Sequence, residues 1–134
     1  PEFHPVAGAE GWQLSNPPIV ALAPLRASME IFSEAGMERL RAKSVQLTGY
    51  LEFLLEQKAS SKFSVITPRE PERRGAQLSI RLAHGGRKLC DRMAAEGVTG
   101  DWREPDVFRV APIPLYNSYH DVYRFVEQFS AVLQ

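Results

Sequence analysis

The stretch VFRVAPIPLYNSYHD, residues 107–121, carries three structural signals within a short span. It opens with a strand-like run, Val107–Val110, in which one arginine stands among apolar residues. Pro112 and Pro114 then exclude a regular helix or a central strand. The segment Ser118–Asp121 predicts a helix start, with a hydroxyl at the N-cap and a carboxylate at N3. The stretch therefore predicts a strand, an irregular loop and a helix, in that order.

Arg109 is the chemically distinctive residue of this run. Side chains alternate between the two faces of a strand, so Phe108 and Val110 are expected in the core and Arg109 on the other face. Its neighbours there, Val107 and Ala111, are apolar, and a guanidinium in such surroundings needs an anion because an unpaired buried charge is costly. One alternative is a ligand carboxylate, held bidentately by the planar fork. The other is structural: Arg109 lies at a solvated strand end or pairs with a structural Asp or Glu. Structural ion pairs are common, so the residue pattern by itself favours the structural partner.

The composition limits the classes of protein to which this chain can belong. The chain has 134 residues, 44% hydrophobic and 24% charged, which fits one globular domain with a real core. Its 16 Lys and Arg residues balance 16 Asp and Glu residues, so no net charge favours nucleic acid or an anionic membrane. No apolar run is long enough to span a bilayer. The single cysteine, Cys90, excludes an internal disulfide and suits a reducing cytoplasm. Basic residues cluster in one region, with glutamates interleaved, and this pattern predicts a solvated loop. The cluster consists of Arg69, Arg73, Arg74 and Arg81.

Hydrophobic periodicity predicts the order of the secondary structure. Apolar residues at helical spacing predict helices over residues 19–35, 37–57, 87–96 and 118–133. Alternation and turn signals predict strands over residues 63–67, 76–82, 98–103 and 107–110. The short connection at 104–106 favours a hairpin between the last two strands. This order predicts an α+β fold, with a small, mostly antiparallel sheet, helices on one face, and a long N-terminal helical arm.

The apolar stripes of these elements are the predicted core. They consist of Leu22, Leu25, Met29 and Phe32; Leu40, Ser44, Leu47, Leu51 and Leu54; Leu78, Ile80 and Leu82; Leu89, Met93 and Ala94; and Val122, Phe125, Val126, Phe129 and Leu133. Pro24 lies inside the first predicted helix, where proline costs about 3 kcal/mol, and predicts a kink or an irregular first turn. Gly36 and Gly97 predict helix ends.

A second polar feature precedes the first predicted helix, in the segment WQLSNPP at residues 12–18. The proline that follows Asn16 forces it toward an extended backbone. Ser15 and Asn16 are preferred N-cap residues, so the pattern favours helix capping, and a polar turn aimed at a ligand is the alternative. Catalytic loop motifs such as Gly-x-Gly-x-x-Gly, the P-loop, Gly-x-Ser-x-Gly and His-Glu-x-x-His are absent. His4 and Glu10 have no further His/Cys cluster that would support a metal site.

Five blocks that cover nearly the whole chain resemble the C-terminal part of the kynureninase family. In chain order they are WQLSNPP (12–18), LRASMEIF (25–32), AKSVQLTGYLEFLL (42–55), ITPREPERRGAQLSIRL (66–82) and RVAPIPLYNS (109–118). The resemblance implies the small C-terminal domain of a fold-type I, aspartate-aminotransferase-like enzyme that uses pyridoxal 5'-phosphate. It assigns residues 1–18 to an arm or linker from the large domain, and residues 19–134 to the small domain.

The resemblance also implies an activity for the complete protein. Kynureninases hydrolyse L-kynurenine, or 3-hydroxykynurenine, to anthranilate, or its 3-hydroxy form, and L-alanine, in tryptophan catabolism and NAD biosynthesis. Arg109 matches the arginine that grips the substrate's α-carboxylate. Asn16 matches the asparagine that reaches the cofactor and the aryl end of the substrate, in a site shared between the subunits of a homodimer. Ser15 matches a position that shapes the preference for the aryl ring.

The same resemblance implies what this chain lacks. The family's Schiff-base lysine, and the acid that pairs with the pyridine nitrogen, lie upstream of the matched blocks. The lysines present match no such motif; they are Lys43, Lys58, Lys62 and Lys88. No catalytic residue is therefore expected here, and the chain alone is expected to be inactive. Two alternatives remain, namely the equivalent domain of another pyridoxal-phosphate-dependent lyase or transaminase, and a non-enzymatic α+β module that binds a partner through the helices of residues 20–55.

Overall fold

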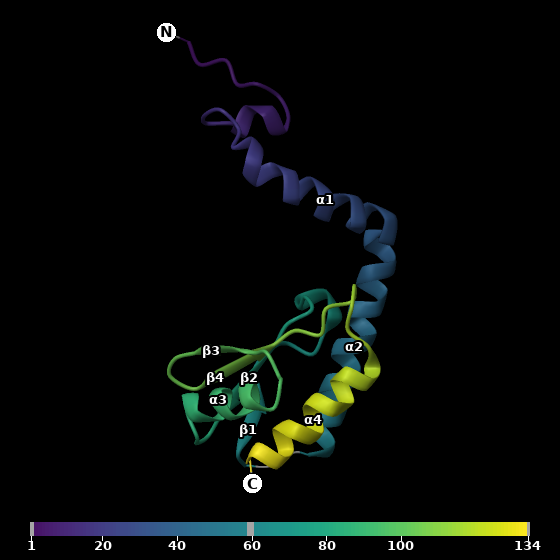
Figure 1. The fold of residues 1–134 in the computed structure, drawn as a ribbon, viewed down its shortest axis with the longest axis vertical. Helices are drawn as coiled ribbons and strands as arrows, with labels where there is room; N and C mark the ends of the chain where they lie inside the picture. Colours follow the sequence, from purple (N-terminus) through teal and green to yellow (C-terminus); the bar gives the residue numbers. More distant parts are fainter. Residues whose placement is uncertain (1, 59–60, 134) are drawn as a thin grey trace. The chain divides into compact units, whose positions relative to one another are not determined.

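The computed structural model describes residues 2–58 and 61–133, which form two compact units divided after Gly36. The elements are η1 (Ala9–Trp12), α1 (Ile19–Ala35), α2 (Met37–Gln57), β1 (Phe63–Val65), η2 (Pro71–Arg73), β2 (Leu78–Leu82), α3 (Arg87–Ala95), β3 (Asp101–Arg103), β4 (Val107–Val110) and α4 (Tyr119–Leu133) (Figure 1). Every predicted helix and strand is present, although β1, β2 and β3 are shorter than predicted. Among the described residues, no helix is long and apolar enough to cross a membrane.

The first unit contains η1 and α1, and neither helix has a buried residue. The predicted irregular first turn is wrong, because α1 is α-helical from Ile19 and continues through Pro24. Pro24 is the sixth residue of α1, so it removes one internal hydrogen bond without ending the helix. The predicted core role of the α1 stripe is also wrong, since its exposed fractions are 40% at Leu22, 52% at Leu25 and 61% at Met29. The described residues of this unit include no second long element that would cover that stripe.

The second unit is built on a four-stranded sheet with the order β1-β2-β4-β3. Every neighbouring pair is antiparallel, and the β3–β4 connection is the predicted hairpin. In the central pair, Ile80 lies opposite Phe108 and Leu78 opposite Val110, so the buried residues of both strands point to the same face. The prediction of a small antiparallel sheet is confirmed.

The helices of the second unit lie on that buried face, where α2 and α4 pack side by side and α3 contacts α4 and β3 (Figure 1). The core cluster consists of Leu47, Leu51, Leu55, Leu78, Ile80, Leu82, Leu89, Met93, Phe108, Val110, Val122, Val126, Phe129 and Val132. Ala94 is exposed, contrary to prediction, and Leu54 is only partly buried. The core face of α2 advances in steps of four residues and therefore reaches Leu55 rather than Leu54. The helix layer on one face of the sheet is confirmed.

The predicted solvated arginine cluster contains one buried member. The side chain of Arg74 is only 3% exposed, and its Nη1 atom donates to Glu52 Oε2 at 2.7 Å. Arg69, in contrast, is 75% exposed and pairs with both Glu52 and Glu56. The loop prediction is therefore wrong at Arg74, because α2 supplies a carboxylate that makes burial of the guanidinium possible.

Candidate functional site

The face of the sheet opposite the helices is polar. Side chains alternate between the two faces along each strand, and residues that lie opposite one another on neighbouring strands point to the same face. Its members are Ser64, Ser79, Arg81, Asp101, Arg103, Val107 and Arg109. Arg109 lies on β4, one of the two inner strands, with Ser79 of β2 on one side and Asp101 of β3 on the other. The sheet thus places Arg109 near the middle of an open, polar surface that also carries Arg81 and Arg103.

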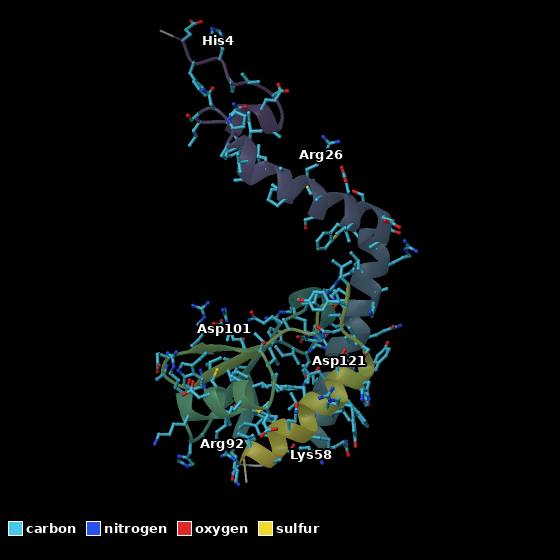
Figure 2. All side chains as sticks on the ribbon, in the orientation of Figure 1. His4, Arg26, Lys58, Arg92, Asp101 and Asp121 are labelled. Carbon is cyan, nitrogen blue, oxygen red and sulfur yellow. The ribbon has the colours of Figure 1, made fainter. Side chains whose placement is uncertain are left out.

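Arg109 is held along one edge of its guanidinium. Its Nε atom donates to Asp101 Oδ2 at 2.6 Å, and its Nη2 atom donates to the same oxygen. The side chain of Arg109 is 29% exposed, so the group is screened by its neighbours but still reachable from solvent. Figure 2 shows Asp101 on the side of the sheet away from α3 and α4, consistent with the strand register.

Asp101 has a second cationic partner. Arg103 lies two residues along β3, on the same face, and its Nε atom donates to Asp101 Oδ2 at 2.9 Å. The hydrogen bond from Arg109 is the largest influence on the pKa of Asp101 and lowers it below its usual range, with the bond from Arg103 acting in the same direction. Asp101 is therefore an anion at neutral pH, placed between two cations.

These contacts support the structural alternative for Arg109. The prediction that Phe108 and Val110 are core residues is confirmed, as is the position of Arg109 on the opposite face. The guanidinium has a protein carboxylate as its partner, as the structural interpretation predicts. Sequence reasoning missed Asp101, although the predicted hairpin contained the signal, since counting outward from the turn at 104–106 places Asp101 opposite Arg109.

The segment after β4 is held by hydrogen bonds within the segment and by one from α2. The backbone N–H of Ile113 donates to Asn117 Oδ1 at 2.8 Å, and Lys43 Nζ donates to the carbonyl of Pro114 at 2.8 Å. At the start of α4, the backbone N–H of Ser118 donates to Asp121 Oδ2, and that of Asp121 donates to Ser118 Oγ. This reciprocal pair is the predicted capping box, which is confirmed.

A half-open hollow of about 540 Å³ lies beside this segment. Its apolar lining includes Val110, Pro112, Val122 and Phe125. Val110 is on the buried face of β4, so the hollow lies on the opposite side of the strand from Arg109. The hollow and the polar face are therefore separate features.

No cluster of metal-binding side chains occurs among the described residues.

Ser15 and Asn16 lie in the first unit, and both are exposed. The N-cap residue of α1 is Pro18, and no side chain caps the helix. The capping role favoured for the Ser-Asn pair is therefore wrong, since the two prolines displace the helix start beyond the reach of either side chain. The carbonyl of Ser15 accepts a hydrogen bond from Gln13 Nε2 at 2.9 Å. The amide of Asn16 is free for another contact.

Comparison with known families identifies the second unit. Residues 40–129 match the family described as "Kynureninase C-terminal domain". The chain belongs to this family. The open sheet face, Arg109 and the capped start of α4 all lie within the matched residues. The expected membership of the kynureninase family is confirmed.

The chain is also similar to several kynureninases. The kynureninase of Koribacter versatilis is 68% identical over 133 residues, covering 99% of this chain and 31% of its own length. Those of Xanthomonas euvesicatoria and Stenotrophomonas maltophilia are each 58% identical over 134 residues, covering 98% of this chain and 32% of their own length. The chain spans about a third of these kynureninases.

Among solved structures, the chain is similar to a NifS-like protein, with a TM-score of 0.72 at 18% identity. The match covers 99% of this chain and 38% of the NifS-like chain. At this identity the similarity concerns the fold alone. It agrees with the predicted α+β fold.

Proposed function

We propose that this chain is the C-terminal portion of an enzyme that hydrolyses L-kynurenine, or 3-hydroxykynurenine, to anthranilate, or 3-hydroxyanthranilate, and L-alanine. The proposal is supported by membership of the kynureninase family and by identities of 58–68% to kynureninases across almost the whole chain. In this proposal the complete protein acts in tryptophan catabolism and NAD biosynthesis, as a cytoplasmic homodimer.

The observation that carries the proposal is the position of Arg109. A partly exposed guanidinium on the open face of the sheet is suited to an anionic group arriving from solvent. We assign it the α-carboxylate of the substrate, because a guanidinium fork matches a carboxylate in shape and charge. The charge-assisted hydrogen bonds would hold the amino-acid end of the substrate in a fixed orientation.

Pyridoxal 5'-phosphate is the cofactor implied by this function, and when bound it supplies an electron sink for the α-carbon of the amino acid. We assign none of the described lysines to the covalent part of that site. Lys43 donates to the carbonyl of Pro114, Lys58 pairs with Glu127 at 3.1 Å, and Lys62 donates to the carbonyl of Leu133. Lys88 is exposed on α3. The Schiff-base lysine is therefore assigned to the part of the kynureninase chain that lies upstream.

Asn16 and Ser15 are assigned to the other end of the substrate. The exposed amide of Asn16 offers both a donor and an acceptor, which suits a contact with the cofactor and with the aryl end of kynurenine. Ser15, beside it, is assigned to the selection between kynurenine and 3-hydroxykynurenine, since a hydroxyl can donate to or accept from the ring substituent. In the homodimer, this turn would belong to a site shared between subunits.

The direct test is turnover by the complete protein with added pyridoxal phosphate. Formation of anthranilate from L-kynurenine, with none from the isolated 134-residue chain, is the expected result. Cysteine and a panel of other amino acids serve as competing substrates. Turnover of one of these, together with inactivity toward both kynurenines, would indicate another lyase or transaminase. Inactivity of the complete protein toward every substrate would favour the non-enzymatic module.

A further inference from the structure

The guanidinium of Arg109 has two edges that can each bind a carboxylate, and the structure uses only one. The side edge, Nε and Nη2, donates to Asp101 Oδ2. The end of the fork is formed by Nη1 and the second hydrogen of Nη2, and Nη1 has no hydrogen-bond partner among the described residues. Arg presents five N–H donors in a fixed plane, so holding one edge also fixes the direction of the other.

The charges around Arg109 leave room for another anion. Arg103 and Arg109 contribute two positive charges and Asp101 one negative charge, so the three residues together carry a net positive charge. Asp101 accepts all three bonds on one oxygen, Oδ2. Arg103 therefore compensates the carboxylate that orients Arg109, and the guanidinium remains attractive to an incoming carboxylate.

We propose that Asp101 is a positioning residue, which holds the side edge of Arg109 so that the Nη1–Nη2 end faces the substrate's α-carboxylate, while Arg103 anchors Asp101 and keeps the group cationic. The inference rests on the proposed function of Arg109. It reconciles the two alternatives for that residue, since one guanidinium takes a structural carboxylate on one edge and a ligand on the other. Asp101 itself touches neither the substrate nor the reacting atoms.

The experiment uses the complete protein with pyridoxal phosphate and measures kcat and KM for L-kynurenine separately. Asp101→Asn keeps the shape of the side chain but removes its charge. A fork that is no longer oriented binds the carboxylate more weakly in ground and transition states alike, so KM should rise about tenfold to a hundredfold with kcat nearly unchanged. Asp101→Glu restores a carboxylate and should recover part of the lost affinity.

The matched control is Asp106→Asn. Asp106 follows β3 in the same hairpin and pairs with Arg81 at 3.5 Å, not with Arg109. This variant should keep the KM of the unmodified protein. A raised KM in both Asn variants to the same extent would overturn the proposal, because the effect would then belong to the hairpin and not to the orientation of Arg109.

Two further outcomes separate the failure of this inference from that of the proposed function. If Arg109→Lys raises KM and Asp101→Asn does not, Arg109 still binds substrate but Asp101 does not position it. If neither variant changes KM, the substrate role of Arg109 fails as well.

A lower KM in Asp101→Asn would also overturn the inference, since Asp101 would then compete with the substrate. Should Asp101→Asn fail to fold, Arg103→Gln decides, with a raised KM expected and an unchanged KM contradicting it.

Discussion

Arg74 and Glu52 form an almost fully buried ion pair, with Nη1 and Oε2 2.7 Å apart and side-chain exposures of 3% and 13%. The pair ties the loop that contains η2 to α2, across 22 residues of sequence. Arg74 Nη1 also donates to the carbonyl of Pro68 at 3.3 Å. Loss of one partner would leave the other charge buried without full compensation.

Arg74→Ala should therefore destabilise the complete protein by about 3 kcal/mol, the lower end of the range for a broken buried pair. The lower end applies because Glu52 keeps a second partner, Arg69. Arg73→Ala is the matched control, since Arg73 is 69% exposed and pairs with Glu70 only at 3.8 Å. Its effect should stay below about 0.5 kcal/mol. Urea unfolding of the two variants measures the difference, and equal midpoints would contradict the structural importance of the buried pair.

The capping box of α4 supports a second stability prediction. Ser118→Ala removes the side-chain acceptor of the N–H of Asp121 and should cost about 1 kcal/mol. Ser64→Ala, on the exposed outer face of β1, is a control in which the same atoms are removed without loss of a cap. Thermal unfolding of both variants is the measurement. A Ser118→Ala protein as stable as the Ser64→Ala protein would show that the cap contributes nothing.

Asp121 links the same cap to pH. The backbone N–H and the hydroxyl of Ser118 both donate to its carboxylate, and these bonds lower the pKa of Asp121 from its ordinary value of 3.8. A depressed folded pKa means that its stabilising contribution is present above that ordinary value and is lost as the pH falls through the folded pKa. Asp121→Asn should therefore flatten the loss of stability below about pH 4. Unfolding free energies measured from neutral to acid pH test this, and parallel curves for the two proteins would contradict it.

The exposed stripe of α1 predicts a surface that binds apolar molecules. Leu22, Leu25 and Met29 lie at helical spacing and are each at least 40% exposed in the isolated chain. The 134-residue chain should bind a hydrophobic dye and self-associate as its concentration rises. The double variant Leu25→Gln, Met29→Gln should reduce both, whereas Arg26→Gln on the same helix should not. A monodisperse chain without dye binding would instead favour an independent module.

Local signals in the sequence were sufficient for most of the fold. Alternation in residues 78–82 and 107–110 predicts β2 and β4 and their buried faces, and the Ser118–Asp121 pattern predicts the start of α4. Burial of Arg74 could not be predicted in this way, because it depends on a carboxylate from α2. The exposure of the α1 stripe also escaped prediction, since periodicity identifies an apolar face but not whether the chain contains the surface that covers it.

The candidate site was predictable in part. Alternation along β4 correctly placed Arg109 on the face opposite the core, but the identity of its partner required the register of the β3–β4 hairpin. Ser15 and Asn16 have the residue types of a helix cap, yet the prolines that follow them move the helix start to Ile19. Their assignment to the substrate therefore depends on the resemblance to kynureninases and stays a prediction.

The most direct test of the account is the kcat/KM for L-kynurenine of Arg109→Ala in the complete protein. In this account substrate binding desolvates the pair formed by Arg109 and the α-carboxylate. Loss of one partner of such a pair costs roughly 2–5 kcal/mol, so kcat/KM should fall by about one and a half to three and a half decades. The melting temperature, measured on the same preparation, reports whether the sheet is intact. A folded Arg109→Ala protein with near wild-type kcat/KM would contradict the assignment of Arg109 to the substrate carboxylate, and a variant that fails to fold would show that its pairing with Asp101 is structural.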